Sequence, residues 1–488
     1  MSDEREQLFL LRLSAELTTK GRGTRRRFTR KLTENVREAL NSTGHSCHVD
    51  SQWTRLFARS AAPDAVEALT RVPGLSSISL VEGQCAADLD EIIRLGTQLF
   101  ADRVKGRTYA VRARRAGEHS FSSKDIHQRL GAALNPGATV NLSNPEVEVE
   151  VEVRDLRAYF FSGRTPALGG LPLGVEGRAV CLISGGFDSA AAAWLMLKRG
   201  VALDYVFCNL AGEAYESSVV QVTRVLSERW SYGTRPTLHV IDFGAPLDNL
   251  RAHAQPRFWQ LTLKRLMYRA ASQVAAATGA LAIVTGEAIG QVSSQTLANL
   301  AAIEGSVAIP VLRPLVGFDK GEIVDLTRRI GTFDLSSKVK EYCAIAPGSP
   351  VTHATPQAAA DEDRKLDPTV LDAAVRDRRV LRLGELTAAD MVESYLYTGE
   401  VPESAVVIDV RGEDEWEEWH YPGALRRDPW ELAEKLSGLD RDRNYVLYCD
   451  AGTQAVFLAE RMQKAGIEAY AYRGGTRTLR ARYEASDS

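Results

Sequence analysis

The chain has 488 residues, a length typical of about three domains. Hydrophobic residues make up 44% of it and charged residues 25%, the mixture of a soluble globular protein. No uninterrupted apolar run reaches the roughly 18 residues of a membrane span, and residues 1–6 are too polar for a signal peptide. We therefore expect a cytoplasmic protein with no membrane partner. The cysteines form no C-x-x-C pair, which argues against a zinc ribbon and a secreted disulfide framework.

The net charge of −3 conceals an uneven distribution. Residues 20–37 are rich in lysine and arginine and hold one acid, and a second basic stretch spans residues 103–115. A basic front half indicates a polyanionic partner, although a solvated helix face would have the same pattern. The candidate contacts are Lys20, Arg25, Arg26, Arg112, Arg114 and Arg115.

The front of the chain reads as a mixture of strands and helices. Residues 7–13 and 75–80 have the pattern of strands, and residues 25–40 and 89–100 have helical spacing. Residues 108–114 alternate apolar and charged side chains, as a strand with one solvent-exposed face does. Val147–Val153 alternates Val with Glu, which predicts a half-buried strand.

A Gly/Pro-rich connector at residues 169–174 marks a domain boundary. Beyond it, strands alternate with helices, which predicts a doubly wound parallel sheet. Residues 350–398 are polar with little apolar content, and we interpret them as a linker with helical pieces. The expected strands of the sheet are 179–183, 203–209, 237–242 and 280–285, with a helix at 190–198, and strands 406–410 and 445–448 belong to a last small α/β unit.

Residues 184–189 (Ser-Gly-Gly-Phe-Asp-Ser) lie between a buried strand and an Ala-rich helix. Ligands bind at this end of a parallel strand, where glycines let the backbone approach a phosphate and the helix start offers free N–H groups. Ser184 and Ser189 can add hydrogen bonds, and Asp188 can help hold Mg²⁺. The loop lacks the Gly-Lys-Ser/Thr ending of a Walker A motif. A Gly-Gly turn alone is usually structural, but the whole hexapeptide resembles the PP-loop of the ATP pyrophosphatases.

Enzymes of that family adenylate an oxygen with ATP and release pyrophosphate, so amidation and tRNA thiolation both remain open. Three further segments, at residues 264–269, 285–296 and 312–320, narrow the choice. Together with the PP-loop they resemble the bacterial tRNA 4-thiouridine synthetases, also called tRNA uridine 4-sulfurtransferases. That resemblance covers essentially the whole chain and implies sulfur transfer to uridine, at position 8 of tRNA, as well as sulfur supply for the thiazole of thiamine.

The same resemblance implies a domain plan. We expect an N-terminal ferredoxin-like domain at 1–61, an RNA-binding THUMP domain at 62–165, a PP-loop adenylation domain at 175–349, the linker at 350–398 and a rhodanese domain at 399–484. THUMP domains bind structured RNA, which makes tRNA the expected partner of the basic residues.

By the family pattern, ATP contacts Leu182, Ile183, Lys264, Gly286 and Gln295, in addition to Ser184, Gly185, Gly186, Asp188 and Ser189 of the loop. Asp188 and Lys320 are implied to be needed for adenylation. A surface ion pair of Lys320 with Asp319 or Glu322 is the structural alternative. The run His45-Ser46-Cys47-His48 lacks further paired ligands, so we expect no metal site beyond Mg²⁺ at Asp188.

Cys449 follows an expected strand and precedes a helix predicted to start near Ala455. Backbone N–H groups at a helix start lower the pKa of a thiol and stabilise a persulfide anion. A buried structural cysteine is the alternative, as we expect for Cys181 and Cys208. Residues 406–411 and 420–424 resemble the opening of a rhodanese domain, whereas Asp450 and Ala451 depart from its usual active loop.

The resemblance implies that Cys343 forms a disulfide with Cys449 during turnover, which would require their Cα atoms to come within about 6–7 Å. It also implies a cysteine desulfurase as sulfur donor, a thiol reductant and the thiamine sulfur-carrier protein as partners. Two rival hypotheses remain: a catalytically decayed RNA-binding protein, and a sulfur carrier that serves mainly thiamine synthesis.

Overall fold

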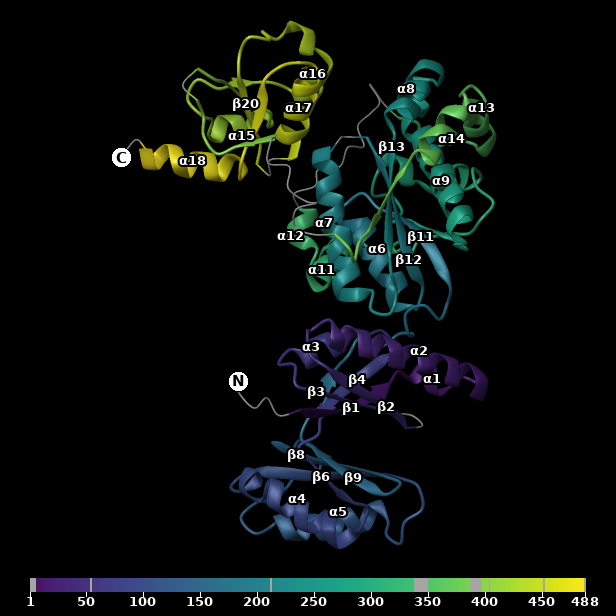
Figure 1. Ribbon diagram of the computed structural model, residues 1–488, viewed down its shortest axis with the longest axis vertical. Helices are drawn as coiled ribbons and strands as arrows, with labels where there is room; N and C mark the ends of the chain where they lie inside the picture. The colour runs from purple at the N-terminus through teal and green to yellow at the C-terminus, as the bar shows by residue number, and fades with distance from the viewer. Residues whose placement is uncertain are drawn as a thin grey trace. The chain divides into compact units, whose positions relative to one another are not determined.

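The computed structural model describes residues 6–52, 55–210, 213–337, 350–386, 396–402, 404–450 and 453–486 (Figure 1). The chain divides into two compact units, one of residues 1–176 with 198–200 and the other of residues 177–197 with 201–488. Each unit holds two β-sheets. Within the described ranges, no helix is both long and apolar enough to cross a membrane.

The first sheet is antiparallel, and its strand order is β10-β4-β1-β3-β2. Helix α2 (Arg22–Asn41) packs on the sheet through Phe28, Leu32 and Val36, which are buried. Helices α1 (Ala15–Thr18) and α3 (Ala65–Thr70) complete this layer. The strands are β1 (Gln7–Leu13), β2 (Cys47–Gln52), β3 (Arg55–Ser60), β4 (Leu75–Leu80) and β10 (Thr165–Pro166).

The predicted boundary between residues 61 and 62 falls inside this sheet. Strand β4 pairs with β1, because its apolar face completes the same core as Leu11 and Leu56. The chain leaves the sheet only after β4 and returns to it at β10. The first domain therefore includes residues 62–80, and the second begins near β5.

The second sheet has the strand order β5-β9-β8-β6-β7. Helices α4 (Leu89–Val104) and α5 (Ser123–Leu134) cover one face of it, and their buried side chains share a core with β6 and β8 (Figure 1). The strands are β5 (Gly83–Ala86), β6 (Thr108–Ala116), β7 (Thr139–Val140), β8 (Val147–Arg154) and β9 (Arg157–Phe161).

The prediction of a half-buried strand at Val147–Val153 is wrong in one respect. Glu150 and Glu152 are only 3% and 1% exposed. Their carboxylates are paired with arginines that lie far away in the sequence: Arg164 with Glu150, and Arg55 with Glu152 at 2.8 Å. Burial of a charge is tolerated only with such partners, so ion pairs replace solvent on this face.

The third sheet is parallel at β15-β14-β11-β12-β13, as the sequence predicts, with β16 added antiparallel to β13. Helices α6 (Phe187–Lys198) and α7 (Glu213–Trp230) lie on one face, and α8 (Gly244–His253) and α9 (Trp259–Thr278) on the other (Figure 1). The strands are β11 (Arg178–Leu182), β12 (Ala202–Asn209), β13 (Thr237–Asp242), β14 (Ile283–Val284), β15 (Val311–Leu312) and β16 (Arg379–Arg382). Helices α10 (Leu297–Glu304), α11 (Lys320–Ile330) and α12 (Phe333–Ser336) follow.

Most of the predicted linker is part of this domain. Helices α13 (Pro356–Asp363) and α14 (Pro368–Arg376) pack on it, and Leu366, Leu371 and Val375 are buried in the same core as β11 and α9. Strand β16 then completes the sheet edge. The segment that joins this sheet to the next therefore shrinks to residues 383–396.

The fourth sheet has the order β17-β21-β20-β18-β19 and is parallel throughout. Its core contains Val407, Val446 and Tyr448. The strands are β17 (Tyr397–Thr398), β18 (Val406–Asp409), β19 (Leu425–Arg426), β20 (Tyr445–Tyr448) and β21 (Ala469–Tyr472), and the helices are α15 (Glu413–Glu418), α16 (Pro429–Glu434), α17 (Thr453–Lys464) and α18 (Gly475–Ser486).

If residues 366–375 belong to the core of the third sheet, Leu371→Ala destabilises that domain by about 2–5 kcal/mol, because it leaves a cavity. Leu281→Ala is the matched control, since Leu281 is 70% exposed and its truncation costs less than about 0.5 kcal/mol. Urea unfolding of the two variants checks this. Equal urea midpoints for the two variants would mean that α14 does not contribute to the core of this domain and is part of a linker.

Candidate functional site

The loop of residues 183–186 connects β11 to α6 at the carboxyl end of the central strand. Gly185 has φ +76°, a backbone conformation that residues with a side chain rarely adopt. Helix α6 begins at Phe187, earlier than the predicted Ala190, so Asp188 and Ser189 lie in its first turn. The N–H groups of this turn point out of the helix start and are suited to bind an anion.

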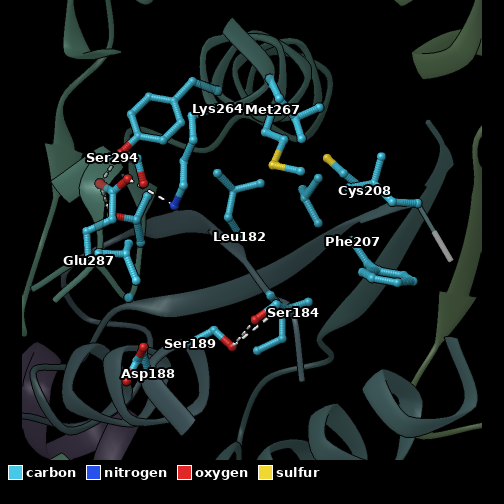
Figure 2. Close-up of a pocket in the computed structure, with 18 of the residues that line it drawn as sticks. Leu182, Ser184, Asp188, Ser189, Phe207, Cys208, Lys264, Met267, Glu287 and Ser294 are labelled. Carbon is cyan, nitrogen blue, oxygen red and sulfur yellow. Dashed lines mark hydrogen bonds and ion pairs between the residues drawn. The ribbon is translucent and has the colours of Figure 1, made fainter. Parts of the chain in front are cut away.

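The hydroxyl of Ser189 braces this loop from within. It accepts a hydrogen bond from the backbone N–H of Ser184 at 3.2 Å and donates to the carbonyl of Gly186 at 3.2 Å (Figure 2). Ser189 is buried, whereas Ser184 is exposed at the loop surface. The two serines therefore differ in place: Ser189 shapes the loop from inside, and Ser184, whose hydroxyl lies 3.4 Å from that of Ser189, is exposed where a ligand could reach it.

Gly286, after β14, lies against the start of α6. A Cβ atom at this position would be 2.6 Å from the carbonyl carbon of Asp188 and 2.7 Å from the backbone nitrogen of Ser189. Those are backbone atoms, which cannot move aside without displacing the loop. Only glycine allows the two segments to approach this closely.

A pocket opens over the loop, between β11, β12 and α9 (Figure 2). One wall is apolar and suits a flat ring, while the opposite side carries Lys264 and Glu287. Gly185 and Gly186 are not among the lining residues and act by shaping the turn. The predicted residues that line the pocket are Leu182, Ile183, Ser184, Asp188, Ser189, Lys264, Gly286 and Gln295, and the apolar wall adds Val206, Phe207, Cys208, Leu263 and Met267.

A buried charge network fixes the side of the pocket that carries Lys264. The Lys264 Nζ lies 3.5 Å from Oε1 of Glu287, and Arg313 Nε donates to Glu287 Oε2 at 3.0 Å. Tyr268 and Thr285 also donate to this carboxylate. The sequence alone assigned no role to Glu287, because its partners come from three separate stretches of the chain.

The ionisation of Glu287 follows from these contacts. Burial raises the pKa of its carboxyl, but the charge of Lys264, the hydrogen bond from Tyr268 and the charge of Arg313 outweigh it and leave the pKa below the ordinary value. Burial and the neighbouring carboxylate raise the pKa of Tyr268 well above its usual range. The site therefore keeps one ionised carboxylate that holds Lys264 toward the pocket.

Asp188 has a partner that the sequence did not reveal. Gln291 Nε2 donates to Oδ2 of Asp188 at 3.0 Å, from the segment that follows Gly286. Asp188 is half-buried and lines the pocket. Its carboxylate can serve Mg²⁺, which binds nucleotides with one or two carboxylates and the phosphates themselves. In the described part of the chain, no group of three or more His, Cys, Asp or Glu side chains forms a metal cage.

Lys320 is the first residue of α11 and is exposed. It is not among the residues that line the pocket. The carboxylates of Asp319 and Glu322 are engaged in a reciprocal capping box, each accepting a backbone N–H at 2.9 Å. Among the described residues Lys320 has no ion pair, which disfavours the surface ion pair with Asp319 or Glu322.

Cys449 lies at the end of β20 and is 1% exposed. Its carbonyl accepts the N–H of Thr476 at 3.2 Å. A Cβ at Gly475 would be 2.6 Å from the Cys449 carbonyl oxygen, so a second glycine-dependent contact holds this turn. Helix α17 begins at Thr453, close to the predicted position. Ala451 and Gly452 lie outside the described residues, as does Cys343.

The negative charge of Asp450 is paired. Arg411 Nη1 lies 3.5 Å from Oδ1 of Asp450, and the same guanidinium bonds the buried Asp409 at 2.6 Å.

Cys181 is buried in β11, and burial raises the pKa of its thiol to about 12, as expected for a structural cysteine. Cys208 is also buried, as expected, and in addition lines the candidate pocket.

The candidate RNA contacts occupy two surfaces of the first unit. Lys20, Arg25 and Arg26 lie at or just before the start of α2. On β6, Arg112 pairs with Glu148 at 3.3 Å, and Arg114 is exposed. Arg115 donates to the carbonyl of Gly117 at 3.0 Å.

Four family models match consecutive parts of the chain: a ThiI ferredoxin-like domain at residues 8–79, a THUMP domain at 86–162, the thiamine biosynthesis protein ThiI at 174–367 and a rhodanese-like domain at 390–481. The tRNA sulfurtransferase of Pyrobaculum aerophilum is 36% identical over 94% of this chain and 95% of its own length. The chain belongs to the tRNA sulfurtransferase family.

Other members of the tRNA sulfurtransferase family agree with this assignment. The enzyme of Thermoplasma acidophilum is 34% identical over 95% of this chain and 94% of its own, and that of Yersinia pestis is 34% identical over 93% and 98%. A crystal structure of a 4-thiouridine synthetase–RNA complex with bound ATP matches with TM-score 0.68 and 31% identity, over 77% of this chain and 99% of that one. The matches span ferredoxin-like, THUMP, PP-loop and rhodanese domains, so the fold class predicted from the sequence is confirmed.

The close approach of Gly286 to α6 makes a direct prediction. Gly286→Ala forces the loop away from its position and weakens ATP binding by about tenfold or more, since losing one hydrogen bond to a charged phosphate is enough for that. Isothermal titration with ATP measures it. Gly305→Ala is the control, because a Cβ there meets nothing closer than 3.8 Å. Unchanged ATP affinity in Gly286→Ala would contradict the assignment of this turn as the phosphate cradle.

The network around Glu287 makes a second prediction. Glu287→Gln leaves Lys264 and Arg313 without their buried counter-charge and destabilises the domain by about 3–5 kcal/mol. Glu304→Gln removes the other carboxylate of Arg313, which is 52% exposed, and costs no more than about 1 kcal/mol. Chemical denaturation of the two variants compares them. A similar loss of unfolding free energy in both variants would show that the burial of Glu287 does not determine how strongly this network stabilises the domain.

Proposed function

We propose that this protein is an ATP-dependent tRNA sulfurtransferase that converts uridine, at position 8, to 4-thiouridine. The observation that carries the proposal is the pocket in which the Gly185 turn, Gly286 and Lys264 meet at the end of β11. Its apolar wall suits adenine and its glycine turn suits a triphosphate. Near-full-length similarity to tRNA sulfurtransferases supports the same chemistry. The cytoplasm is the expected location.

The first step is adenylation. The O4 atom of uridine attacks the α-phosphorus of ATP, pyrophosphate leaves, and the N3 proton is lost so that a double bond forms between N3 and C4. Lys264 neutralises charge on the phosphates, and Asp188 holds the Mg²⁺ that accompanies ATP. Lys320 is proposed to act on the departing pyrophosphate from outside the pocket, at the exposed start of α11. Gln295 hydrogen-bonds a polar edge of the nucleotide.

The first unit is proposed to hold the tRNA. A THUMP domain matches residues 86–162 of this unit, and a related 4-thiouridine synthetase was crystallised with RNA. Exposed cations at the start of α2 and on β6 suit phosphate and 2′-OH contacts, which recognise the shape of a structured RNA rather than its sequence. Arg112 and Arg115 already have protein partners, so Lys20, Arg26 and Arg114 are better placed for this role.

The second step is sulfur transfer. A cysteine desulfurase loads a persulfide on Cys449. Its terminal sulfur attacks C4 of the adenylated uridine, and the C4–O bond breaks to release AMP. The thiolate of Cys343 then attacks Sγ of Cys449, which leaves the terminal sulfur on the tRNA and forms the Cys343–Cys449 disulfide. A thiol reductant restores both thiols.

The segment of residues 383–396, shorter than the predicted linker, limits the distance over which Cys449 can move to reach the nucleotide pocket. A chain of the length of residues 383–396 spans at most roughly 50 Å when fully extended. We propose that this segment carries the rhodanese domain to the PP-loop domain during turnover. It replaces the much longer linker that the sequence indicated.

A second role in thiamine synthesis is favoured by the family model of the central domain, which describes a thiamine biosynthesis protein. In that role Cys449 would pass sulfur to the thiamine sulfur-carrier protein. The competing hypothesis of a decayed RNA-binding protein is disfavoured, because the pocket keeps its glycine turn, Asp188 and Lys264 together. A carrier that serves thiamine alone would have no need for that pocket.

The two cysteines give the sharpest test of the function. Cys449→Ser abolishes 4-thiouridine, whereas Cys343→Ala stops after about one sulfur transfer per enzyme with the tRNA still joined to Cys449 through a disulfide, because no thiolate attacks Sγ of Cys449. Mass spectrometry of the nucleosides and of the enzyme–tRNA adduct, after reaction with ATP, cysteine desulfurase and a protein thiol reductant in place of dithiothreitol, measures both. Cys181→Ala is the control and should retain activity. Full multiple-turnover activity in Cys343→Ala would refute its resolving role, and absence of 4-thiouridine with the unmodified enzyme would refute the function.

A further inference from the structure

Gln291 is held in one orientation beside the nucleotide pocket, next to Val292 and in contact with Asp188, two residues that line it. Its Nε2 donates to Oδ2 of Asp188 at 3.0 Å, which a carboxylate requires of the amide nitrogen. The other end of the amide, Oε1, is covered and has no hydrogen-bond partner among the described residues. A covered acceptor without a donor is costly, so this oxygen is suited to a donor that arrives with a substrate.

The residues on either side of Gln291 form an apolar rim. Ile289 is 50% exposed, and Val292 is 37% exposed and also lines the pocket. The N–H of Ile289 donates to the carbonyl of Val316 at 3.3 Å, and Val316 is 41% exposed. One polar acceptor is thus placed within exposed apolar side chains, the combination that binds an unstacked base: contact for its face and a hydrogen bond for its edge.

The chemistry of adenylation places the uracil edge at this rim. For reaction, O4 must lie roughly 3–3.5 Å from the α-phosphorus, and N3–H is the neighbouring group on the ring. N3–H is a donor and needs an acceptor once the base leaves water. Gln291, bonded to Asp188 of the same pocket, offers one through Oε1.

We propose that Gln291 Oε1 accepts the N3–H of the target uridine, while Ile289 and Val292 contact the face of the base. Because Oε1 is covered in this structure, base binding moves the rim segment of residues 289–292. Gln291 then acts as the residue that selects uridine, since cytidine presents a lone pair at N3 and repels a carbonyl oxygen. This inference rests on the proposed function of the same pocket.

The test compares binding of two tRNAs that differ only at the target position, one with uridine and one with cytidine. Affinities are measured with Mg²⁺ and α,β-methylene ATP, which occupies the pocket without reacting. We expect the unmodified enzyme to prefer the uridine tRNA by about tenfold, a usual contribution of one hydrogen bond to base discrimination. Gln291→Leu should bring that ratio close to one when α,β-methylene ATP saturates the pocket.

Gln273→Leu is the matched control. Gln273 also donates to an aspartate, Asp372, at 2.8 Å, but lies on the exposed surface of α9. That variant should keep the uridine preference. An unchanged ratio in Gln291→Leu would overturn the inference, and a raised Mg²⁺ requirement with that unchanged ratio would assign Oε1 to a magnesium-bound water instead. Failure of the unmodified enzyme to form 4-thiouridine would instead refute the proposed function.

Discussion

The site depends on the contact between the backbones of Gly286 and Asp188. Strands β11 and β14 are neighbours in the sheet, so the segments that leave them meet at the same edge. A side chain of any size at position 286 would separate them, because its Cβ would lie 2.6 Å from a backbone carbon. This contact brings the PP-loop and the segment of Glu287 and Gln291 onto one pocket. The proposed nucleotide site is thus formed by two loops rather than by the hexapeptide alone.

Buried charge is used in two different ways along the chain. In the first unit, Glu150 and Glu152 are satisfied by arginines from both of its sheets, and the pairs take the place of an apolar contact. In the candidate pocket, Glu287 pairs with Lys264 and Arg313, and Lys264 lines the pocket as the cation proposed to meet the phosphates. Burial of such groups costs free energy and is tolerated only where each charge has a partner. The first arrangement is structural, and the second prepares the site for an anionic ligand.

Local pattern was sufficient for the parts of the fold that depend on nearby residues. The strands near residues 7, 75, 179, 203 and 445 and the loop at 184–189 are where periodicity and glycine placement predict them. The errors arose where distant partners decide. Polar composition suggested a linker at 350–398, but Leu371 and Val375 meet the sheet core. The alternating glutamates of β8 predicted a solvent-exposed face, because the arginines that pair with them, Arg55 and Arg164, are not adjacent to them in sequence.

The candidate site shows the same division. Eight of the predicted nucleotide contacts line one pocket, because a family motif specifies them together: Leu182, Ile183, Ser184, Asp188, Ser189, Lys264, Gly286 and Gln295. Glu287 and Gln291 were missed, since their roles follow from side-chain contacts with Lys264 and Asp188 and not from spacing. The pairing of Cys343 with Cys449 stays a prediction. Only Cys449 lies in the described part of the chain.

The central claim is that this pocket adenylates O4 of a tRNA uridine before sulfur replaces that oxygen. Labelling O4 of the target uridine with oxygen-18 tests it, with mass spectrometry of the nucleotide released during 4-thiouridine formation. The mechanism predicts AMP that carries the heavy oxygen, because the bond that breaks joins C4 to O4. Unlabelled AMP, or ADP in its place, would contradict the account.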